Sequence, residues 1–293
     1  MRLLNYRRGS QIEFGVERNG NVLPLRSVGY ARDLEFFSDG EKALAAARSL
    51  MARADAESAP LADVQRLSPV LQPGKILCVG LNYRDHAVES KMQIPEVPTI
   101  FLKLPNAVTG PDAEIVLPTN STQPDYEAEF AAVIGVGGRN IAAERWREHI
   151  AGYTILNDVS ARDVQLATSQ WTLGKSFDTF APMGPAIVTQ DEIPDPHALD
   201  IQLSIDGEVL QHSNTRELIF KLPELIAYIS AVVPLEPGDV ISTGTPAGVG
   251  LGRTPQRWLR PGEEIVIRIP GIGELKNRTV AEKSHRATAG ARK

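Results

Sequence analysis

The sequence predicts a mixed, mostly β fold with a few flanking helices, preceded by a small N-terminal α+β domain. Short apolar runs between prolines and glycines recur from residue 75 onward, a pattern typical of strands and turns. Helical patterns are fewer and do not alternate regularly with these runs, so a doubly wound parallel sheet is not expected. The length of 293 residues allows one large domain or a main domain with a small one beside it.

The composition is that of an ordinary globular protein, with 42% hydrophobic residues, 23% charged residues and a net charge of −5. No basic stripe is interleaved with aromatic residues, so no nucleic-acid partner is expected. The N-terminus lacks the apolar segment of a secretory signal, and no run reaches the length of a membrane-spanning helix. These features predict a cytoplasmic protein without a membrane partner. The one cysteine, Cys78, excludes an intramolecular disulfide and is expected to be a core thiol.

Residues 1–70 are predicted to form the small N-terminal domain. Two strand-like pieces flank the tetrapeptide "RNGN", which is a hairpin-turn signal. Residues 40–59 are rich in alanine and carry an apolar stripe, which predicts one helix. A polar stretch containing prolines then leads to residue 70, where we place the domain boundary.

Residues 71–280 are predicted to form the main domain. Runs such as "KILCVG", "TIFLKL", "AEFAAVIGV", "YTILNDV" and "EIVIRI" indicate its strands. Helices are expected at residues 142–150, 160–169 and 215–233, the last split or kinked by Pro223. The basic tail, residues 281–293, is expected to be disordered.

The segment "DYEAEFAAVIG", residues 125–135, places two glutamates on one face of a predicted strand. Alternate side chains of a strand point to the same face, so Glu127 and Glu129 lie side by side next to Asp125. The opposite face is apolar. Like charges repel, and carboxylates are rarely buried unless something pairs them.

A third carboxylate, Asp158, directly follows the strand-like run "YTIL". If Glu127, Glu129 and Asp158 lie at the ends of neighbouring strands, they form an all-oxygen site suited to a hard divalent cation such as Mg²⁺ or Mn²⁺. The alternative is a solvated strand face, with Asp158 at the start of a helix. The spacing alone favours this alternative, because a Glu-x-Glu strand is a weak signal.

The segment "GLNYRDHAVES" leaves an apolar strand and turns into a short predicted helix. His86 and Glu89 are three residues apart, so they share a helix face. A carboxylate beside an imidazole fixes the tautomer of the ring and raises its basicity, which makes the pair a candidate base. The alternative is a surface histidine with an incidental acidic neighbour.

Two glycine-containing loops lack the spacing of a nucleotide site. "LGKSFDTFAPMGP" carries Lys175 but has Ser169 where a phosphate loop needs its first glycine. "GDVISTGTPAGVGLG" lacks the G-x-G-x-x-G spacing of a dinucleotide site. No nucleotide cofactor is therefore expected.

Taken together, these motifs resemble those of the fumarylacetoacetate hydrolase family. The resemblance covers most of residues 75–280 and rests on five segments in the family's order: "GLNYRDHAVES", "DYEAEF", "NDVSARDVQ", "GKSFDTFAPMGP" and "GDVISTGTPAGVG". It implies a β-roll or sandwich core carrying the site, a homodimer, and divalent-metal chemistry on small 2-oxo or 1,3-diketo acids.

The resemblance also implies residue roles, which are transferred only to matching positions of this sequence. The metal would be Mg²⁺ or Mn²⁺, with Ca²⁺ as an alternative. The implied metal ligands are Glu127, Glu129 and Asp158, the implied catalytic residues are His86, Glu89 and Lys175, and the implied substrate contacts are Arg162, Gln165, Lys175 and Thr245.

The expected function is a metal-dependent hydrolase that cleaves a C–C bond of an acylpyruvate-type 2-oxo acid. In this scheme His86, oriented by Glu89, activates water, and the metal stabilises the enolate that leaves. Two alternatives use the same site: a 2-hydroxydienedioate isomerase and an oxaloacetate-type decarboxylase. A third alternative is a metal-binding or ligand-binding protein without turnover, because fold does not fix function.

Overall fold

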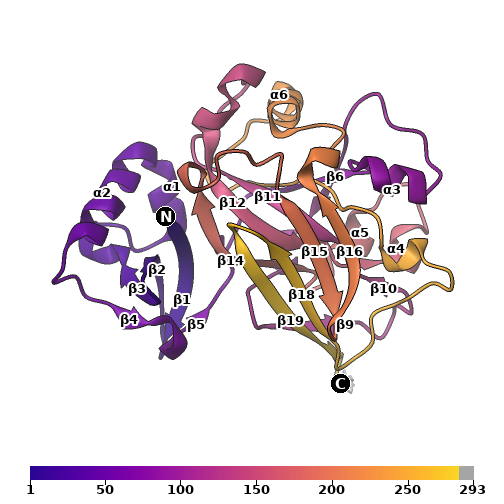
Figure 1. Cartoon of the computed structure of the whole chain (residues 1–293), viewed down its shortest axis with the longest axis horizontal. Helices are drawn as coiled ribbons and strands as arrows, with labels where there is room; N and C mark the ends of the chain where they lie inside the picture. Colours follow the sequence, from indigo (N-terminus) through magenta and orange to yellow (C-terminus); the bar gives the residue numbers. More distant parts are fainter. Residues whose placement is uncertain (284–293) are drawn as a thin grey trace, which may run out of the picture.

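The computed structural model describes residues 1–283, and its main feature is a large, twisted sheet (Figure 1). The sheet runs from strands of the N-terminal segment at one edge to the strand before Leu104 at the other. Its strands are β1 (Arg2–Arg8), β2 (Gln11–Arg18), β3 (Asn21–Pro24), β4 (Ala59–Pro60), β5 (Gln65–Arg66), β6 (Ile76–Gly80), β7 (Thr99–Lys103), β8 (Val108–Thr109), β11 (Ala128–Ile134), β12 (Ile150–Asn157), β14 (Ala181–Thr189) and β17 (Val240–Ser242). Their order is β4-β3-β2-β1-β14-β12-β11-β17-β6-β7, with β5 paired to β1 and β8 to β14.

A second sheet packs across the middle of the first. Its strands are β9 (Glu114–Leu117), β15 (Asp200–Ile205), β16 (Glu208–Asn214), β18 (Glu264–Ile269) and β19 (Gly273–Ala281), in the order β16-β15-β18-β19-β9. It contacts β11, β12 and β14, the centre of the larger sheet, as Figure 1 shows. A short ladder joins β10 (Pro124–Asp125) to β13 (Ser160–Ala161).

Helices are short and lie around the sheets, which confirms the mixed, mostly β fold class. Two of them, α1 and α2, cover the N-terminal strands (Figure 1). The α-helices are α1 (Asp33–Ser38), α2 (Gly40–Ala52), α3 (Arg84–Glu89), α4 (Arg162–Gln165), α5 (Thr172–Lys175) and α6 (Leu222–Val232). The 3-10 helices are η1 (Leu25–Val28), η2 (Leu61–Asp63), η3 (Pro105–Ala107), η4 (Ala143–His149), η5 (Gln190–Glu192), η6 (Thr215–Glu217) and η7 (Gly250–Gly252).

The N-terminal segment contains the predicted hairpin and joins the main sheet. The turn between β2 and β3 places Asn19 and Gly20 at positive φ, 53° and 75°, the backbone that an Asn-Gly turn favours. Strand β1 pairs with β14, with Leu3 opposite Ile187. One sheet therefore crosses the boundary near residue 70, and the division into two domains stays a prediction.

Several predicted helices are shorter than their patterns suggested. The helix expected at residues 40–59 ends at Ala52, because Ala59 and Pro60 pair with β3. Of residues 142–150, Ala143–His149 form a 3-10 helix and no α-helix, and only four residues of 160–169 are α-helical. Residues 215–233 are split as expected: Pro223 lies in the first turn of α6, where its missing N–H breaks no helical hydrogen bond.

The predicted C-terminal tail starts too early. Ala281 is the last residue of β19 and pairs with Leu117. Strand pairing with β9 therefore extends one residue into the segment expected to be disordered. Residues 284–293 of that segment lie outside the described residues.

The register of the central strands creates the site. All seven residues of β11 are buried, and Ala128 at its start pairs with Asn157 at the end of β12. The backbone N–H of Asp158 also donates to the carbonyl of Glu127, at 2.9 Å. The start of one strand and the end of the next therefore hold their acidic side chains next to each other.

Candidate active site

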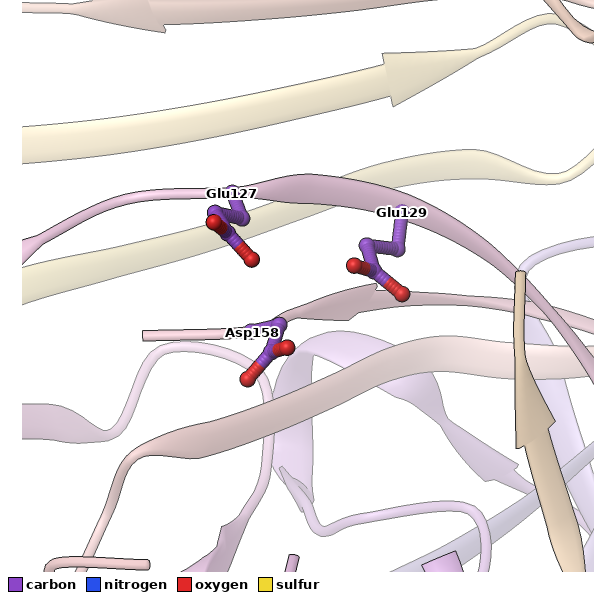
Figure 2. Close-up of side chains that lie close together, drawn as sticks. All are labelled: Glu127, Glu129 and Asp158. Carbon is purple, nitrogen blue, oxygen red and sulfur yellow. The ribbon is translucent and has the colours of Figure 1, made fainter. Parts of the chain in front are cut away.

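Three buried carboxylates meet at the junction of β11 and β12 (Figure 2). Glu127, Glu129 and Asp158 each offer an oxygen, and these oxygens lie within 4.8 Å of one another. Their exposed fractions are 5%, 1% and 0%. The alternative of a solvated strand face is therefore wrong, because side chains from β7, α4, α5 and β17 contact these carboxylates and enclose them.

Glu127, Glu129 and Asp158 form an acidic cluster, and buried lysine and arginine side chains lie next to it. Lys175 Nζ lies 2.7 Å from Glu127 Oε2 and 2.8 Å from Asp158 Oδ2. Lys103 Nζ lies 2.6 Å from Asp158 Oδ1 and also donates to the carbonyl of Val159. Arg162 pairs with Glu127. The cations offset much of the charge that burial would otherwise make costly.

The cations are distributed unequally over the three acids. Burial opposes ionisation of Glu127, but the charges of Arg162 and Lys175 outweigh burial and lower its pKa. Glu129 instead accepts hydrogen bonds from the Ser242 hydroxyl and the Gly244 amide. Burial and the negative charges of the other two acids raise the pKa of Glu129.

This donor set fits a hard divalent cation. Its ligand atoms are carboxylate oxygens that lie close to one another. The negative charges of Glu127 and Asp158 disfavour ionisation of Glu129, and a cation between the three acids would favour it. The cluster also lies at strand ends, where β11 and β12 fix the backbone. The expectation that these residues lie together as a metal-binding set is consistent with this geometry.

The His86–Glu89 pair lies on α3, as the sequence predicted. His86 Nδ1 is 3.1 Å from Glu89 Oε2, and the amide of Gly248 donates to Glu89 Oε1 at 2.9 Å. Burial opposes ionisation of Glu89, but the hydrogen bonds from His86 and Gly248 lower its pKa. Asn82 holds the turn before α3 through side-chain bonds to Phe220 and Thr243 carbonyls.

The pair lines one cavity of about 470 Å³, together with Glu127 and Glu129 of the acidic cluster. Phe101 and Trp171 form an edge-to-face pair at its wall, with ring centroids 5.4 Å apart, and Lys175 Nζ lies 5.0 Å from the centre of the Phe101 ring. Asp158 is fully buried and does not line the cavity. The other predicted site residues line it, namely His86, Glu89, Glu127, Glu129, Arg162, Gln165, Lys175 and Thr245.

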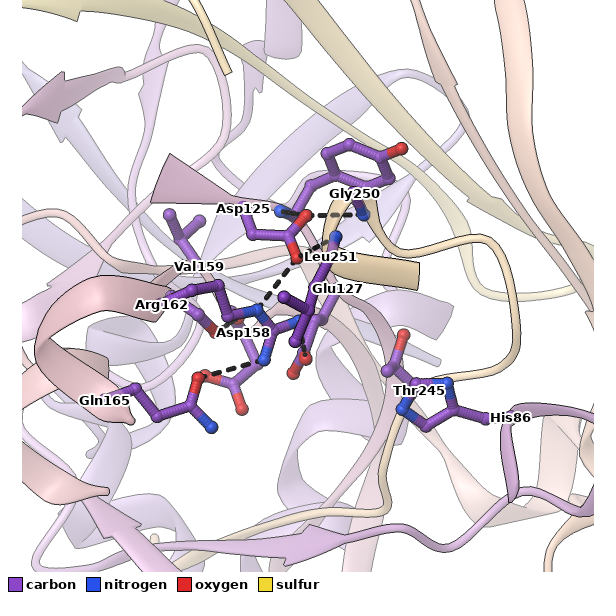
Figure 3. Close-up of polar contacts among 12 residues, drawn as sticks. His86, Asp125, Glu127, Asp158, Val159, Arg162, Gln165, Thr245, Gly250 and Leu251 are labelled. Atoms are coloured by element: carbon purple, nitrogen blue, oxygen red, sulfur yellow. Dashed lines mark hydrogen bonds and ion pairs between the residues drawn. The ribbon is translucent and has the colours of Figure 1, made fainter. Parts of the chain in front are cut away.

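The three residues expected to contact only substrate are also tied to the protein (Figure 3). Arg162 donates to Asp125, Glu127 and Gln165. Thr245 donates to the carbonyl of Ala128 at 3.0 Å. Gly174 allows α5 to touch α4, because an added Cβ would lie 2.4 Å from the Gln165 amide nitrogen. Their contacts with substrate stay predictions.

Sequence reasoning gave no role to two buried charged residues at the site. Lys103 is the single charge in the apolar run "TIFLKL", and a lone lysine in a buried strand is a signal that a partner acid is needed. The sequence pattern puts Asp125 on the acidic face of the strand, but two of its partners, Arg162 and Gly250, lie on α4 and η7, far away in the sequence.

The chain belongs to the fumarylacetoacetate hydrolase family and is an enzyme of that family: residues 75–280 match the family described as "Fumarylacetoacetate (FAA) hydrolase C-terminal". It is 45% identical over 248 residues to the rat (Rattus norvegicus) protein "Oxaloacetate tautomerase Fahd2a, mitochondrial", covering 84% of this chain and 79% of the rat protein.

Solved structures of related enzymes are also similar. One is 2-hydroxyhepta-2,4-diene-1,7-dioate isomerase from Mycobacterium marinum, with 35% identity, a TM-score of 0.78 and coverage of 97% and 100% of the two chains. Another is maleylpyruvate hydrolase from Sphingobium sp. SYK-6 in complex with manganese(II) and pyruvate, with 31% identity, a TM-score of 0.82 and the same coverage. Within residues 1–283, no helix is both long enough and apolar enough to cross a membrane.

Proposed function

We propose that this enzyme moves a proton at the carbon next to the carbonyl of a small 2-oxo acid, interconverting its keto and enol forms. The observation that carries the proposal is one cavity lined both by the His86–Glu89 pair and by Glu127 and Glu129 of the acidic cluster. The 45% identity to a protein named as an oxaloacetate tautomerase supports a 2-oxo dicarboxylic acid as the substrate.

Glu127, Glu129 and Asp158 would hold a divalent cation, for which Mg²⁺ and Mn²⁺ are the proposed ions. When bound, the cation would supply Lewis-acid stabilisation of negative charge on substrate oxygens. The manganese(II) ion of the similar Sphingobium complex supports this choice. Lys175, buried between two of the acids, would place a further positive charge beside the cluster.

His86 would carry the proton. Its imidazole would take the proton from C3 of the keto acid, the C–H electron pair would become the C2–C3 double bond, and a proton would be returned to the carbonyl oxygen. Glu89 would fix the imidazole tautomer through Nδ1 and leave Nε2 as the reacting atom. Gln165 and Thr245 line the same cavity and would contact polar groups of the acid.

Hydrolysis of a C–C bond is the second candidate, because the similar Sphingobium enzyme is named as a maleylpyruvate hydrolase. The same imidazole would then take a proton from water, and the hydroxide formed would attack the carbonyl farther from the carboxylate. The two activities would differ in whether water has room beside His86.

The test uses protein that is stripped of metal and then supplied with Mg²⁺ or Mn²⁺. Faster loss of the oxaloacetate enol absorbance without pyruvate would support the tautomerase, and pyruvate from oxaloacetate would indicate decarboxylation. Pyruvate formed from acetylpyruvate would indicate the hydrolase. Failure of the metal to accelerate any of these reactions would contradict the proposal.

Two variants assign the proton carrier in the same assay. His86→Gln should lower the rate by about 10²–10⁴-fold, the usual contribution of general acid–base catalysis, while binding of Mn²⁺ is kept. Glu148→Gln is the control, because Glu148 is exposed and pairs with Arg145 away from the cavity. An unimpaired His86→Gln variant would rule out the histidine as base.

The proposed assembly is a homodimer, as the family resemblance implies. Light scattering of the purified protein tests it, and a monomer at micromolar concentration would contradict it.

A further inference from the structure

Asp125 is a fully buried carboxylate with four hydrogen-bond donors (Figure 3). Its Oδ1 accepts from the amides of Gly250, at 2.7 Å, and Tyr126, at 2.8 Å. Its Oδ2 accepts from the Leu251 amide, at 3.0 Å, and from Arg162 Nε, at 2.8 Å. Both oxygens are engaged by protein donors, so its contribution must come through the groups it holds.

One of these groups is the loop 248–252, which supports Glu89. The Gly248 amide donates to Glu89 Oε1 at 2.9 Å. At Gly252 the backbone passes so close that an added Cβ would lie 2.7 Å from Glu89 Cδ. The position of this loop therefore limits the positions available to the Glu89 carboxylate. Because His86 Nδ1 pairs with this carboxylate, the loop also influences the orientation of the His86 ring.

The other group is Arg162, which is attached to the acidic cluster. Its Nη2 pairs with Glu127 Oε1, and its Nη1 donates to Gln165 Oε1 at 2.9 Å. Its side chain is 5% exposed, so these bonds are shielded from water and keep their strength. A continuous series of contacts thus runs from Glu89 through the loop, Asp125 and Arg162 to Glu127.

We propose that Asp125 is a positioning residue that fixes the His86–Glu89 pair relative to the acidic cluster. The two halves of the site come from different elements, the His86–Glu89 pair from α3 and the carboxylates from the start of β11. Proton transfer requires the distance between these two halves to be held to within a fraction of an ångström. Asparagine at this position would offer one acceptor oxygen. In either orientation its NH₂ group would face two N–H donors, those of Leu251 and Arg162 or those of Gly250 and Tyr126. The kinetic part of this inference rests on the proposed function.

The experiment compares Asp125→Asn with Asp239→Asn. Asp239 is also 0% exposed and accepts a backbone amide, that of Glu236 at 2.7 Å, but it lies outside the cavity. For both variants we would measure the thermal midpoint, Mn²⁺ affinity, kcat and KM for oxaloacetate tautomerisation, and the ¹⁵N signals of the His86 ring, assigned with His86→Gln.

Asp125→Asn should lower kcat by about 10–100-fold, the usual effect of losing an outer hydrogen-bond partner, with smaller changes in KM and Mn²⁺ affinity. The His86 ring signals should move toward those of Glu89→Gln. Asp239→Asn should lower the thermal midpoint and leave kcat and the ring signals unchanged. Equal effects in the two variants would reduce Asp125 to a structural role and overturn the proposal.

Gly252→Ala keeps the test decisive if Asp125→Asn does not fold. Its new methyl group meets the movable end of the Glu89 side chain, so the fold should survive while the carboxylate shifts. The His86 signals should change and kcat should fall. Unchanged signals and kcat would overturn the proposal. If the wild type turns over no 2-oxo acid, the proposed function fails, and the NMR comparison alone still decides whether Asp125 positions the pair.

Discussion

The surroundings of Glu129 are unfavourable for its ionised side chain in the metal-free protein but favourable for binding a cation. It lacks the lysine and arginine partners that its two neighbours have, and burial and their negative charges raise its pKa. The ionised form of such a buried carboxylate destabilises the folded protein unless a cation lies beside it. Its presence at strand β11 is therefore best explained by what it binds.

Glu129→Gln should weaken Mn²⁺ binding by about 100-fold, because a neutral amide replaces a ligand carboxylate and even the outer partners of metal ligands are worth 10–100-fold. The metal-free variant should unfold at the same urea concentration as the wild type or a higher one. The amide keeps the buried volume and an acceptor oxygen for Ser242 and Gly244, while the charge repulsion is removed. Titration calorimetry and urea unfolding measure the two effects. Glu148→Gln, at an exposed site, is the control, and unweakened binding in Glu129→Gln would remove this residue from the metal site.

His197 should make stability depend on pH. Its Nε2 accepts a hydrogen bond from the amide of Leu222 at the start of α6, which requires a neutral ring. Burial, together with the charge of Lys221, lowers the pKa of His197 to about 4. Between that value and the ordinary value near 6.5, the unfolded chain binds the extra proton, so stability falls as pH falls through this range.

Going from pH 7 to pH 5 should therefore cost the wild type about 2 kcal/mol more than it costs His197→Gln. Urea unfolding at the two pH values measures the difference. His212→Gln, at an exposed position, should behave like the wild type. If the wild type and both variants lose the same free energy of unfolding between pH 7 and pH 5, the pKa of His197 is not lowered in the folded protein.

Site residues could be predicted from the sequence only where they belong to ordered motifs. The spacing of Glu127 and Glu129 and the three-residue step from His86 to Glu89 are local, and the structure reproduces both pairs. Lys103 was not predicted because its partner, Asp158, lies 55 residues away. The same holds for Asp125, whose bond to the Gly250 amide spans 125 residues.

At the scale of elements, α2 provides a test of which helix face is buried. Ala43, Ala47 and Leu50 are buried on one side, and Ala45 is exposed on the other. Ala47→Asp would place a charge in the core and should destabilise the protein by about 2–4 kcal/mol. Ala45→Asp should change the free energy of unfolding by less than about 0.5 kcal/mol. Equal effects in urea unfolding would contradict this packing of α2.

Strands were predicted better than helices, for a physical reason. The apolar runs of β6, β11 and β12 are buried along their whole length, so hydrophobicity alone marks them. The segment after Ala52 has helix-forming residues, yet the chain leaves the helix to pair Ala59 and Pro60 with β3. Tertiary pairing overrode local propensity there, and the sequence carries no local sign of it.

At the scale of the whole molecule, a bound cation should raise stability through mass action. At a free Mn²⁺ concentration 100 times its dissociation constant, the free energy of unfolding should increase by about 2.7 kcal/mol. Thermal unfolding with increasing Mn²⁺ measures this, and Asp158→Ala should show no such increase. A wild-type midpoint that does not respond to the ion would contradict binding by the folded state.

The order of strands in the large sheet also limits when the enzyme can form during its synthesis. Strand β6, which leads into the His86 helix, pairs with β7 and with β17, and the latter, Val240–Ser242, comes more than 150 residues later. Glu89 then needs the amide of Gly248. A nascent chain in which residues 240–248 are still inside the ribosome lacks both contacts, so the active protein cannot assemble before this segment has emerged.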